Sequence, residues 1–540
     1  DATGGGPFRL MHRPRRFNAA EGCWMGWERK RGKLEQFNAF VLGGDIAPFT
    51  VTAGEVETLR DIRFVVTADA DTRLPPCSVN LLAGTLAHPL NVARFDAATG
   101  RVRSGYTILQ PRVEIAPENA VRSPFTRFFA GDMAIDIYSR AVSDVYQDLF
   151  GSGIFVGKGI YDVAAFTRSL EGRIPENAVL SHDLIEGLHG RAALASDIIV
   201  YEGFPSGYLD HARRWHRWVR GDWQLLPWLL PRVPVRDGAR LTNRLTLLDR
   251  WKITDNLRRS LVPISLVALA LAGWFVLPGN PWVWTLLTVA APGAYLFTDL
   301  VTGLARGRRR GVMVGTMRRL RDHAGRWAFA VAFLVNDAVV AADAILRTLW
   351  RLVSRRRLLE WTSAAHMAAR FSGRDARAAA WREMWPSPAF AVLAALALAL
   401  AAPASLLPAS PLLLLWLLAP EIAAFASRDR AVPVEEIDEA DRAWLRRVAR
   451  RSWLFFETFV RPEDNWLPPD NYQEAPHEEI ARRTSPTNIG MMMLAALTAW
   501  KLGHIGLNEL AMRLSNALDA IDRLERHRGH ILNWYETHTL

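Results

Sequence analysis

Four long apolar runs, arranged as two hairpins, constrain the fold of this chain more than any other feature. Residues 261–277 and 282–304 are separated only by a Pro-Gly-Asn-Pro turn, and residues 389–407 and 412–426 only by Pro-Ala-Ser-Pro. Each run of the first pair holds roughly the 20 apolar residues needed to cross about 30 Å of hydrocarbon. The pattern predicts four membrane spans, with each hairpin returning the chain to the side from which it came.

Basic residues beside these runs indicate which side is cytoplasmic. The chain carries a net charge of +11 although half of its residues are hydrophobic, a combination usual for membrane proteins with basic cytoplasmic loops. Arginine clusters at 306–310 and 318–321 follow the first hairpin and mark the cytoplasmic side by the positive-inside rule. Because the basic residues crowd beside apolar runs rather than forming a free arm, the charge does not predict nucleic-acid binding.

A fifth apolar segment, 327–350, favours a different structure. It carries Asn336 and two aspartates, and arginine clusters flank both of its ends. Spanning the membrane would strand one cluster outside, so the segment is predicted to be an interfacial amphipathic helix. Four spans then place every soluble part of the chain on the cytoplasmic side. The two cysteines, Cys23 and Cys77, form no disulfide framework and suit a reducing compartment.

Two aspartates one residue apart follow a strand-like run in the region before the membrane segments. Phe64, Val65 and Val66 have the pattern of a buried strand, and Asp69 and Asp71 come soon after it. At the carboxyl end of a parallel strand, such a pair is placed to hold a divalent metal and the diphosphate of a sugar nucleotide. A solvated turn that caps a core strand is the alternative interpretation.

A second acidic signal, Ser181-His182-Asp183, lies roughly a hundred residues further on, where a turn leads into a short helix. An enzyme that joins sugars needs a carboxylate to take the proton from the attacking hydroxyl group. Asp183 is the candidate for this base. Its alternative role is that of an N-cap for the helix that follows.

An arginine- and tryptophan-rich segment, 214–224, precedes the first membrane run. Arg214 and Arg217, at helical spacing, can neutralise a departing diphosphate. The indole of Trp218 can stack on a sugar or a glucan chain. The alternative is an anchor at the membrane surface, because Trp and Arg are both favoured there.

Two further segments combine glycine with basic residues. Gly153, Lys158 and Tyr161 belong to a stretch that lacks the Gly-Lys-Ser/Thr ending and the long helix of a phosphate loop, so a nucleotide triphosphatase is not predicted. A loop close to an acceptor sugar fits better, with an ordinary tight turn as the alternative. Lys33 and Asn38 lie in a second segment, expected to be a loop that meets a diphosphate or a solvated turn.

Beyond residue 434 the composition becomes charged and helical. Apolar and aromatic residues recur at helical spacing over 442–459, 488–502 and 507–524. This pattern predicts antiparallel helix pairs.

The order of these motifs resembles a known family. Asp-x-Asp, His-Asp and Arg-x-x-Arg-Trp-x-Arg-Gly-x-x-Gln, followed by membrane hairpins, are similar to the processive inverting glycosyltransferases related to cellulose synthase. The stretches RKRGKLEQFN, GKGIYD, HRWVRGDWQ, LLEWTSAAH and RTSPTNIG resemble more specifically the bacterial cyclic β-1,2-glucan synthases, over nearly the whole chain. In that family a glycosyltransferase module is followed by membrane helices, a glucoamylase-like cyclisation domain and a phosphorylase-like domain.

The resemblance implies a role for each candidate residue. Asp183 would be the catalytic base, and Asp71 would hold Mg²⁺ or Mn²⁺. The nucleotide sugar and its diphosphate would be bound by a larger set, namely Asp69, Asp71, Lys33, Asn38, Arg214, Arg217 and Gln224. The acceptor glucan would be bound by Trp218 and by the loop that contains Gly153, Lys158 and Tyr161.

The resemblance also implies an architecture. Residues 1–258 are expected to form an α/β glycosyltransferase domain of the GT-A type that lacks its first nucleotide-binding strand. Residues 259–430 are expected to form an α-helical transmembrane bundle, and residues 431–540 the first helices of an (α/α)6 toroid. The glutamates that cut and rejoin the glucan would lie past Leu540. The expected location is the bacterial inner membrane.

The function implied is inverting transfer of glucose from UDP-glucose onto a growing β-1,2-glucan. The expected partners are UDP-glucose, the glucan acceptor and the lipid bilayer. Two alternatives remain at this point: a processive synthase of another β-glycan, related to cellulose synthase, and an inactive glycan-binding membrane fragment.

Overall fold

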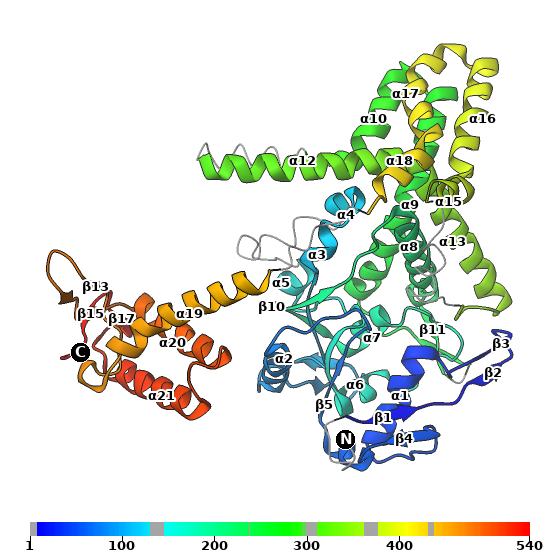
Figure 1. The fold of residues 1–540 in the computed structure, drawn as a ribbon. Coiled ribbons are helices and arrows are strands. Elements are labelled where there is room, and N and C mark those ends of the chain that lie inside the picture. Colours follow the sequence, from blue (N-terminus) through cyan, green and yellow to red (C-terminus); the bar gives the residue numbers. More distant parts are fainter. Residues whose placement is uncertain are drawn as a thin grey trace. The chain divides into compact units, whose positions relative to one another are not determined.

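The computed structural model (Figure 1) describes residues 8–129, 145–236, 238–294, 296, 310–360, 376–429 and 437–540. The chain divides into two compact units, Asp1–Val432 and Pro433–Leu540. The first unit combines a β-sheet and its flanking helices with long apolar helices. The second unit is a small assembly of helices and two-stranded hairpins.

A four-stranded mixed sheet forms the centre of the first unit. Its strands are β5 (Phe64–Thr67), β8 (Ile108–Ile115), β9 (Gly159–Asp162) and β10 (Ala192–Glu202), in the order β10-β8-β9-β5. β10 runs parallel to β8, whereas β9 is antiparallel to both β8 and β5. The strand expected before Asp69 is therefore present, but its hydrogen-bonded neighbour is antiparallel. β5, β8 and β10 still point in one direction, so their carboxyl ends lie at the same edge.

The two faces of this sheet are buried under different helices. Because side chains alternate along a strand, Ile108 and Tyr161 face one side, whereas Leu109 and Ile160 face the other. The first side packs against α1 (Arg29–Val41) and α6 (Val163–Leu170), and the second against α2 (Ser78–Ala87). This alternation produces three layers, with the sheet in the middle.

The other elements of the region before the apolar helices are short or lie at the sheet edge. The helices here are α3 (Pro117–Ala120), α4 (Pro124–Phe129), α5 (Val145–Phe150), α7 (Asp183–Gly190) and α8 (Tyr208–Trp223), with 3-10 turns at Val56–Asp61 and Leu226–Leu229. Four antiparallel pairs complete it: β1 (Leu10–His12) with β4 (Val51–Ala53), β2 (Arg16–Asn18) with β3 (Cys23–Met25), β6 (Arg94–Phe95) with β7 (Val102–Ser104), and β11 (Arg232–Pro234) with β12 (Arg240–Thr242).

Apolar helices follow, and α9 (Leu247–Phe275) is the first of them. Thr246 and Asp249 form a capping box at its start, so the helix begins well before the first apolar run and crosses position 258/259 without a break. Among the described residues, α9 alone is long and apolar enough by itself to cross a membrane. If each sharply bent helix pair is counted as one crossing, the number rises to at most four.

The remaining apolar helices are α10 (Pro281–Ala290), α12 (Arg310–Ala332), α13 (Leu334–Ser354), α15 (Ala376–Met384), α16 (Pro386–Ala401), α17 (Leu406–Leu417) and α18 (Ala419–Ala426), with 3-10 turns at Ala291–Gly293 and Pro403–Ser405. Most of them share with α9 a core that contains Trp274 and Trp416. α15 and α18 instead pack into a second core with Tyr208. Part of the predicted span 282–304 lies outside the described residues, at 295 and 297–304.

The segment expected to be one interfacial helix, 327–350, is divided between two helices. α12 ends at Ala332, α13 begins at Leu334, and the axes bend by 64° between them. α13 packs along α8 and α9 rather than lying free on a surface. The polar residues of the segment explain this packing, because Asn336 and Asp337 both hydrogen-bond the hydroxyl group of Tyr208.

The described residues of the second unit, 437–540, form three helices, α19 (Glu439–Phe459), α20 (Pro486–Lys501) and α21 (Leu507–Arg523), around a core that includes Trp453 and Leu510. A 3-10 turn lies at Pro462–Asp464. Its strand pairs are β13 (Tyr472–Gln473) with β14 (Glu479–Ile480), β15 (Arg483–Thr484) with β18 (Tyr535–Glu536), and β16 (Arg526–His527) with β17 (His530–Ile531). α21 lies within the predicted stretch 507–524, whereas α19 and α20 begin a few residues before the predicted stretches 442–459 and 488–502.

Candidate active site

Three carboxylates meet at the edge where β5, β8 and β10 end. Asp69 and Asp71 follow β5, and Glu202 is the last residue of β10; one oxygen of each lies within 4.8 Å of the others. The turn after β5 is closed by a hydrogen bond from the Asp69 amide to the Thr72 hydroxyl oxygen, 3.0 Å. The next residue, Arg73, then forms a backbone bridge with Tyr201 of β10. This bridge holds the turn that contains Asp71 beside the end of β10, close to Glu202.

Three cationic side chains surround this carboxylate edge. The ammonium of Lys30, on α1, lies 2.7 Å from an Asp69 oxygen. Lys158 contacts Glu202 closely and lies 3.4 Å from the other Asp69 oxygen, and Arg214 lies 3.8 Å from Glu202. Burial alone would raise the pKa of Asp69, but the hydrogen bond and charge of Lys30, together with Lys158, outweigh it and lower the pKa. Asp69 is therefore held in its charged form.

A second acidic group lies at the start of α7. His182 precedes the helix, Asp183 is its first residue and Glu186 is one turn further on, and these side chains also offer ligand atoms within 4.8 Å of one another. Nδ1 of His182 lies 2.8 Å from a Glu186 oxygen. One oxygen of Asp183 is buried without a hydrogen-bond partner among the described residues. Asp183 is not the N-cap, because the structure places His182 in that position.

Gly157 connects the two acidic groups. A Cβ atom at this position would lie 2.6 Å from an Asp183 oxygen, and the residue has a φ of 85°, so both space and backbone geometry require glycine. The carbonyl oxygen of Gly157 accepts a hydrogen bond from Lys30, the same ammonium that binds Asp69. Asp69, Asp71 and Asp183 therefore lie in one region of the molecule.

A cavity of about 560 Å³ extends from Asp71 along α8. Its wall is rich in arginines, which come from α8 (Arg213, Arg214, Arg217 and Arg220), from α13 (Arg347 and Arg351) and from Arg122. The guanidinium of Arg214 also stacks on the ring of Trp218, 4.8 Å from its centroid, and 44% of Trp218 remains exposed. A cavity lined by arginines suits a ligand that carries a negatively charged group. The exposed ring of Trp218 offers a surface for an uncharged part of the same ligand.

Gly221 and Gln224, at the end of α8, position the loop that precedes Asp183. A Cβ atom on Gly221 would lie 2.2 Å from the Ser181 hydroxyl oxygen, so glycine is needed for this close approach. The Gln224 side chain accepts a hydrogen bond from the Leu180 amide and donates one to the Leu358 carbonyl, both 2.7 Å. Gln224, expected to bind the diphosphate, uses these polar atoms for the scaffold instead.

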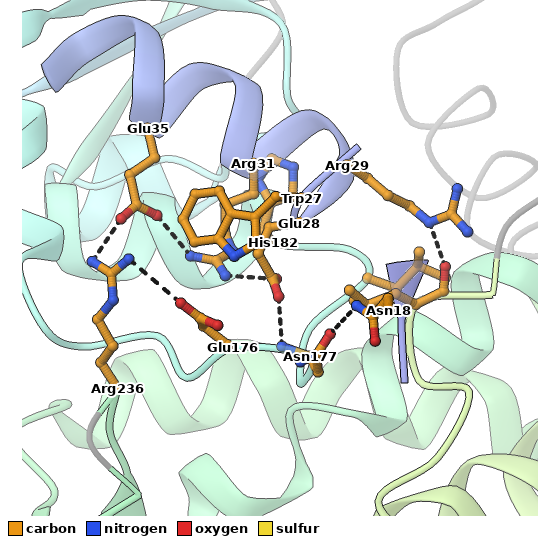
Figure 2. A network of polar contacts seen from close by, with 12 residues as sticks. Asn18, Trp27, Glu28, Arg29, Arg31, Glu35, Glu176, Asn177, His182 and Arg236 are labelled. Atoms are coloured by element: carbon orange, nitrogen blue, oxygen red, sulfur yellow. Dashed lines mark hydrogen bonds and ion pairs between the residues drawn. The ribbon is translucent and has the colours of Figure 1, made fainter. Parts of the chain in front are cut away.

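A polar network fixes α1, which carries Lys30, to the loop before α7 (Figure 2). Arg31 binds Glu28 at 2.6 Å and Glu35 at 3.0 Å. Glu28 in turn accepts a hydrogen bond of 2.6 Å from the Asn177 amide. Lys30 is therefore held by a rigid element rather than by a flexible loop.

The segment of Lys33 and Asn38 is this helix, not the loop or turn that the sequence predicted. Lys33 lies near the site, where burial and the charges of Lys30 and Arg13 lower its pKa. Asn38 is buried, and its side-chain oxygen accepts a hydrogen bond of 2.7 Å from the Tyr161 hydroxyl group. Asn38 and Tyr161 thus pair with each other in the core.

The residues of the glycine-rich stretch also have different roles. The Gly153 amide bonds to the Ala192 carbonyl, and its own carbonyl accepts a hydrogen bond from Lys252, so Gly153 supports the fold. Lys158, expected near the acceptor, lies in the carboxylate edge. Lys30 and Glu202 belong to the site but were not singled out from the sequence. Glu202 follows an apolar strand as Asp69 does, which is the signal that could have revealed it.

The part of the chain that holds this site matches a glycosyltransferase family. Residues 64–298 match the family described as "Glycosyl transferase family group 2". The match begins with β5 and covers both acidic groups, α8 and α9.

A more specific relationship comes from one curated relative. The chain is 41% identical over 547 residues to "Cyclic beta-(1,2)-glucan synthase NdvB" of Rhizobium meliloti (strain 1021), across 99% of this chain. The resemblance predicted from the motifs is thereby confirmed. The chain spans 19% of the length of that relative.

Proposed function

We propose that this chain is the glucosyltransferase part of a cyclic β-1,2-glucan synthase. In this proposal UDP-glucose is the donor, a growing β-1,2-glucan is the acceptor, and the configuration at the anomeric carbon is inverted. The three layers around the mixed sheet support a domain of the GT-A type. The glucose donor and the 1,2 linkage rest on the similarity to the curated relative.

Asp183 is the proposed base. Its carboxylate takes the proton from the acceptor hydroxyl group while that oxygen bonds to the anomeric carbon and the bond to UDP breaks. Attack from the face opposite UDP converts an α-linked donor into a β-glucoside in one displacement. The Asp183 side chain is 31% exposed, so an acceptor hydroxyl group can reach its carboxylate.

The carboxylate edge fits a divalent cation. Asp69, Asp71 and Glu202 offer oxygen ligands within 4.8 Å of one another, and oxygen is the ligand that Mg²⁺ and Mn²⁺ prefer. A cation held there would offset negative charge on the departing diphosphate. Arg214 and Arg217 line the adjoining cavity and neutralise the rest of that charge, and Trp218 stacks on the acceptor sugar.

The proposed location is the bacterial inner membrane, with the glycosyltransferase domain in the cytoplasm. Residues 259–430 are proposed to form the membrane region, and residues 431–540 the start of a glucoamylase-like (α/α)6 domain. The helix α9 supports this arrangement, because it runs without a break from the glycosyltransferase domain into an apolar segment that can enter the bilayer.

The observation that carries the proposal is the convergence of Asp183 on the carboxylate edge through Gly157. Asp183→Asn in the membrane-bound protein is expected to reduce UDP release from UDP-glucose at least about 10²–10⁴-fold, because a base contributes that much. Asp197→Asn, at an exposed position of β10, is the matched control and should leave turnover unchanged. Normal turnover in Asp183→Asn would show that another group is the base.

The product distinguishes the proposed synthase from its relatives. Linkage analysis of the glucan made from UDP-glucose should give 1,2 bonds. A 1,4- or 1,3-linked product would indicate a synthase of another β-glycan, which shares the same site chemistry.

A further inference from the structure

Lys158 lies where a divalent cation would have to bind. Its ammonium is in contact with Glu202 and lies 3.4 Å from an Asp69 oxygen, so it already uses two of the three carboxylates of the edge. Its side chain is 9% exposed. Lys30 also binds Asp69, but its side chain is 32% exposed and makes no contact with Glu202.

Cationic side chains already offset the charges of this edge without a metal ion, and Lys33 and Arg217 also interact with Asp69. Three carboxylates (Asp69, Asp71 and Glu202) face three cationic side chains (Lys30, Lys158 and Arg214). An ammonium and a divalent cation repel each other strongly at the few ångströms that would separate them here, because Lys158 and Glu202 are both buried and water screens their charges poorly. They also compete for the same oxygen lone pairs. Both cannot occupy the space between Asp69 and Glu202.

If a metal ion binds Asp69 and Glu202, the ammonium of Lys158 loses both of its anionic partners. A buried ammonium without an anionic partner is costly, so a displaced Lys158 must find another anion. The sugar nucleotide of the proposed function brings one, because its diphosphate binds beside the same edge. Backbone geometry keeps the lysine close: its neighbours Gly157 and Gly159 are held against Asp183 and Leu109 respectively.

We propose that Lys158 is a built-in counter-cation of the carboxylate edge, which a divalent cation displaces and the donor diphosphate then binds. This inference rests on the proposed function for its second half, the transfer to a nucleoside diphosphate. Its first half, the competition with the metal ion, concerns only the free protein. Lys158 therefore couples metal binding to donor binding, rather than contacting the acceptor.

Metal affinity provides the first test. Free Mn²⁺ is titrated by electron paramagnetic resonance against the whole membrane protein in detergent, without donor. Lys158→Met should bind Mn²⁺ about tenfold or more tightly than the unmodified protein, because a competing charge is removed. Lys30→Met is the matched control: it removes the same charge from the same aspartate, but from a more exposed position, and should change the affinity less. Lys158→Arg should stay near the unmodified value.

Equal or weaker Mn²⁺ binding in Lys158→Met, compared with Lys30→Met, would overturn the proposal. A second measurement needs no variant. Acylation of lysines in the unmodified protein, followed by mass spectrometry, should label Lys158 more strongly when Mn²⁺ is added, and UDP added with Mn²⁺ should suppress the labelling again. Labelling that Mn²⁺ leaves unchanged would also overturn the proposal.

The two proposals fail separately. UDP release from UDP-glucose is measured on the same preparation. If no UDP is released but Mn²⁺ binding and Lys158 labelling change as expected, the proposed donor is wrong and the counter-cation role is supported. If UDP is released but neither measurement responds to Lys158, the proposed function stands and the counter-cation role is refuted.

Discussion

The two acidic groups of the site contain the same number of ligand-bearing side chains but differ in what surrounds them. The carboxylate edge of Asp69, Asp71 and Glu202 is matched by lysines and an arginine. The group at α7 is more buried and has fewer cationic partners; one oxygen of Asp183 has no hydrogen-bond partner among the described residues. A charge-balanced edge suits exchange of one ion for another, whereas a carboxylate short of donors suits acceptance of a proton.

Gly157 lies between the two groups, so its replacement should produce the largest effect. Gly157→Ala places a Cβ atom 2.6 Å from an Asp183 oxygen and displaces that carboxylate. Misplacement of a reacting group by about 1 Å can cost roughly 10²-fold, so UDP release should fall by at least about that factor. The free energy of unfolding should fall by about 1–3 kcal/mol because of the left-handed backbone.

Gly172→Ala is the control for this backbone effect. Gly172 has a φ of 68°, and nothing lies within 4 Å of its ideal Cβ position. The variant should lose about 1–2 kcal/mol of stability from backbone strain alone and keep its activity. If both variants lost activity equally, the contact between Gly157 and Asp183 would have no part in catalysis.

Gln224 should show a smaller effect, because it acts on Asp183 through the loop. Gln224→Ala removes the bonds to Leu180 and Leu358. The stability loss should be about 1–3 kcal/mol, since buried backbone groups lose their partners. The turnover number should fall about tenfold while KM for UDP-glucose changes little, because only the base is shifted.

Asn243→Ala is matched to this variant. Asn243 is also a buried amide that bonds to two carbonyls, but these belong to Trp228 and Leu230 and not to the loop of Asp183. It should lose similar stability and retain its turnover number. A rise in KM without a fall in turnover for Gln224→Ala would instead favour a direct contact between Gln224 and the donor.

The parts of this site that could be predicted from the sequence are those with local signals. The run before Asp69 is apolar and the residues after it form a turn, so the position of the aspartates follows from neighbouring residues. Glu202 was not predicted, because β5 and β10 are the outer strands of the sheet. Only the bridge between Arg73 and Tyr201 brings their ends together. The apolar run before Glu202 could mark it as a candidate, but no local pattern shows that it meets Asp69 and Asp71.

The wrong expectation for the Lys33 segment has a similar cause. Gly32 and its basic neighbours have the composition of a loop, yet Gly32 lies within α1, where a Cβ atom would meet the Trp27 carbonyl at 2.2 Å. The glycine serves close packing rather than a turn. The pairing of Asn38 with Tyr161 depends on the stacking of α1 over β9, which a sequence pattern does not specify.

Two histidines at opposite ends of α7, His182 and His189, should show the smallest effects, and with opposite sign. Burial alone lowers the pKa of His182, but the charges of Glu186 and Asp183 outweigh it and raise the pKa above its usual value. His189, in the last turn of α7, has its pKa lowered to about 3 by burial and by Arg173.

The sign of each contribution to stability follows from these shifts. His182 stabilises the fold fully below pH 6.5, its usual pKa, and loses that contribution as pH rises through its raised value. His189 stabilises the fold above pH 6.5 and loses its contribution as pH falls towards about 3.

The midpoint of thermal unfolding, followed by tryptophan fluorescence from pH 5 to 8, should therefore change differently in the two variants. His182→Gln should be destabilising mainly at the acidic end, whereas His189→Gln should flatten the acid-side loss of stability. If the His182→Gln difference instead grew with rising pH, the α7 group would not hold a protonated imidazole. The contrast between the two acidic groups would then lose its electrostatic basis.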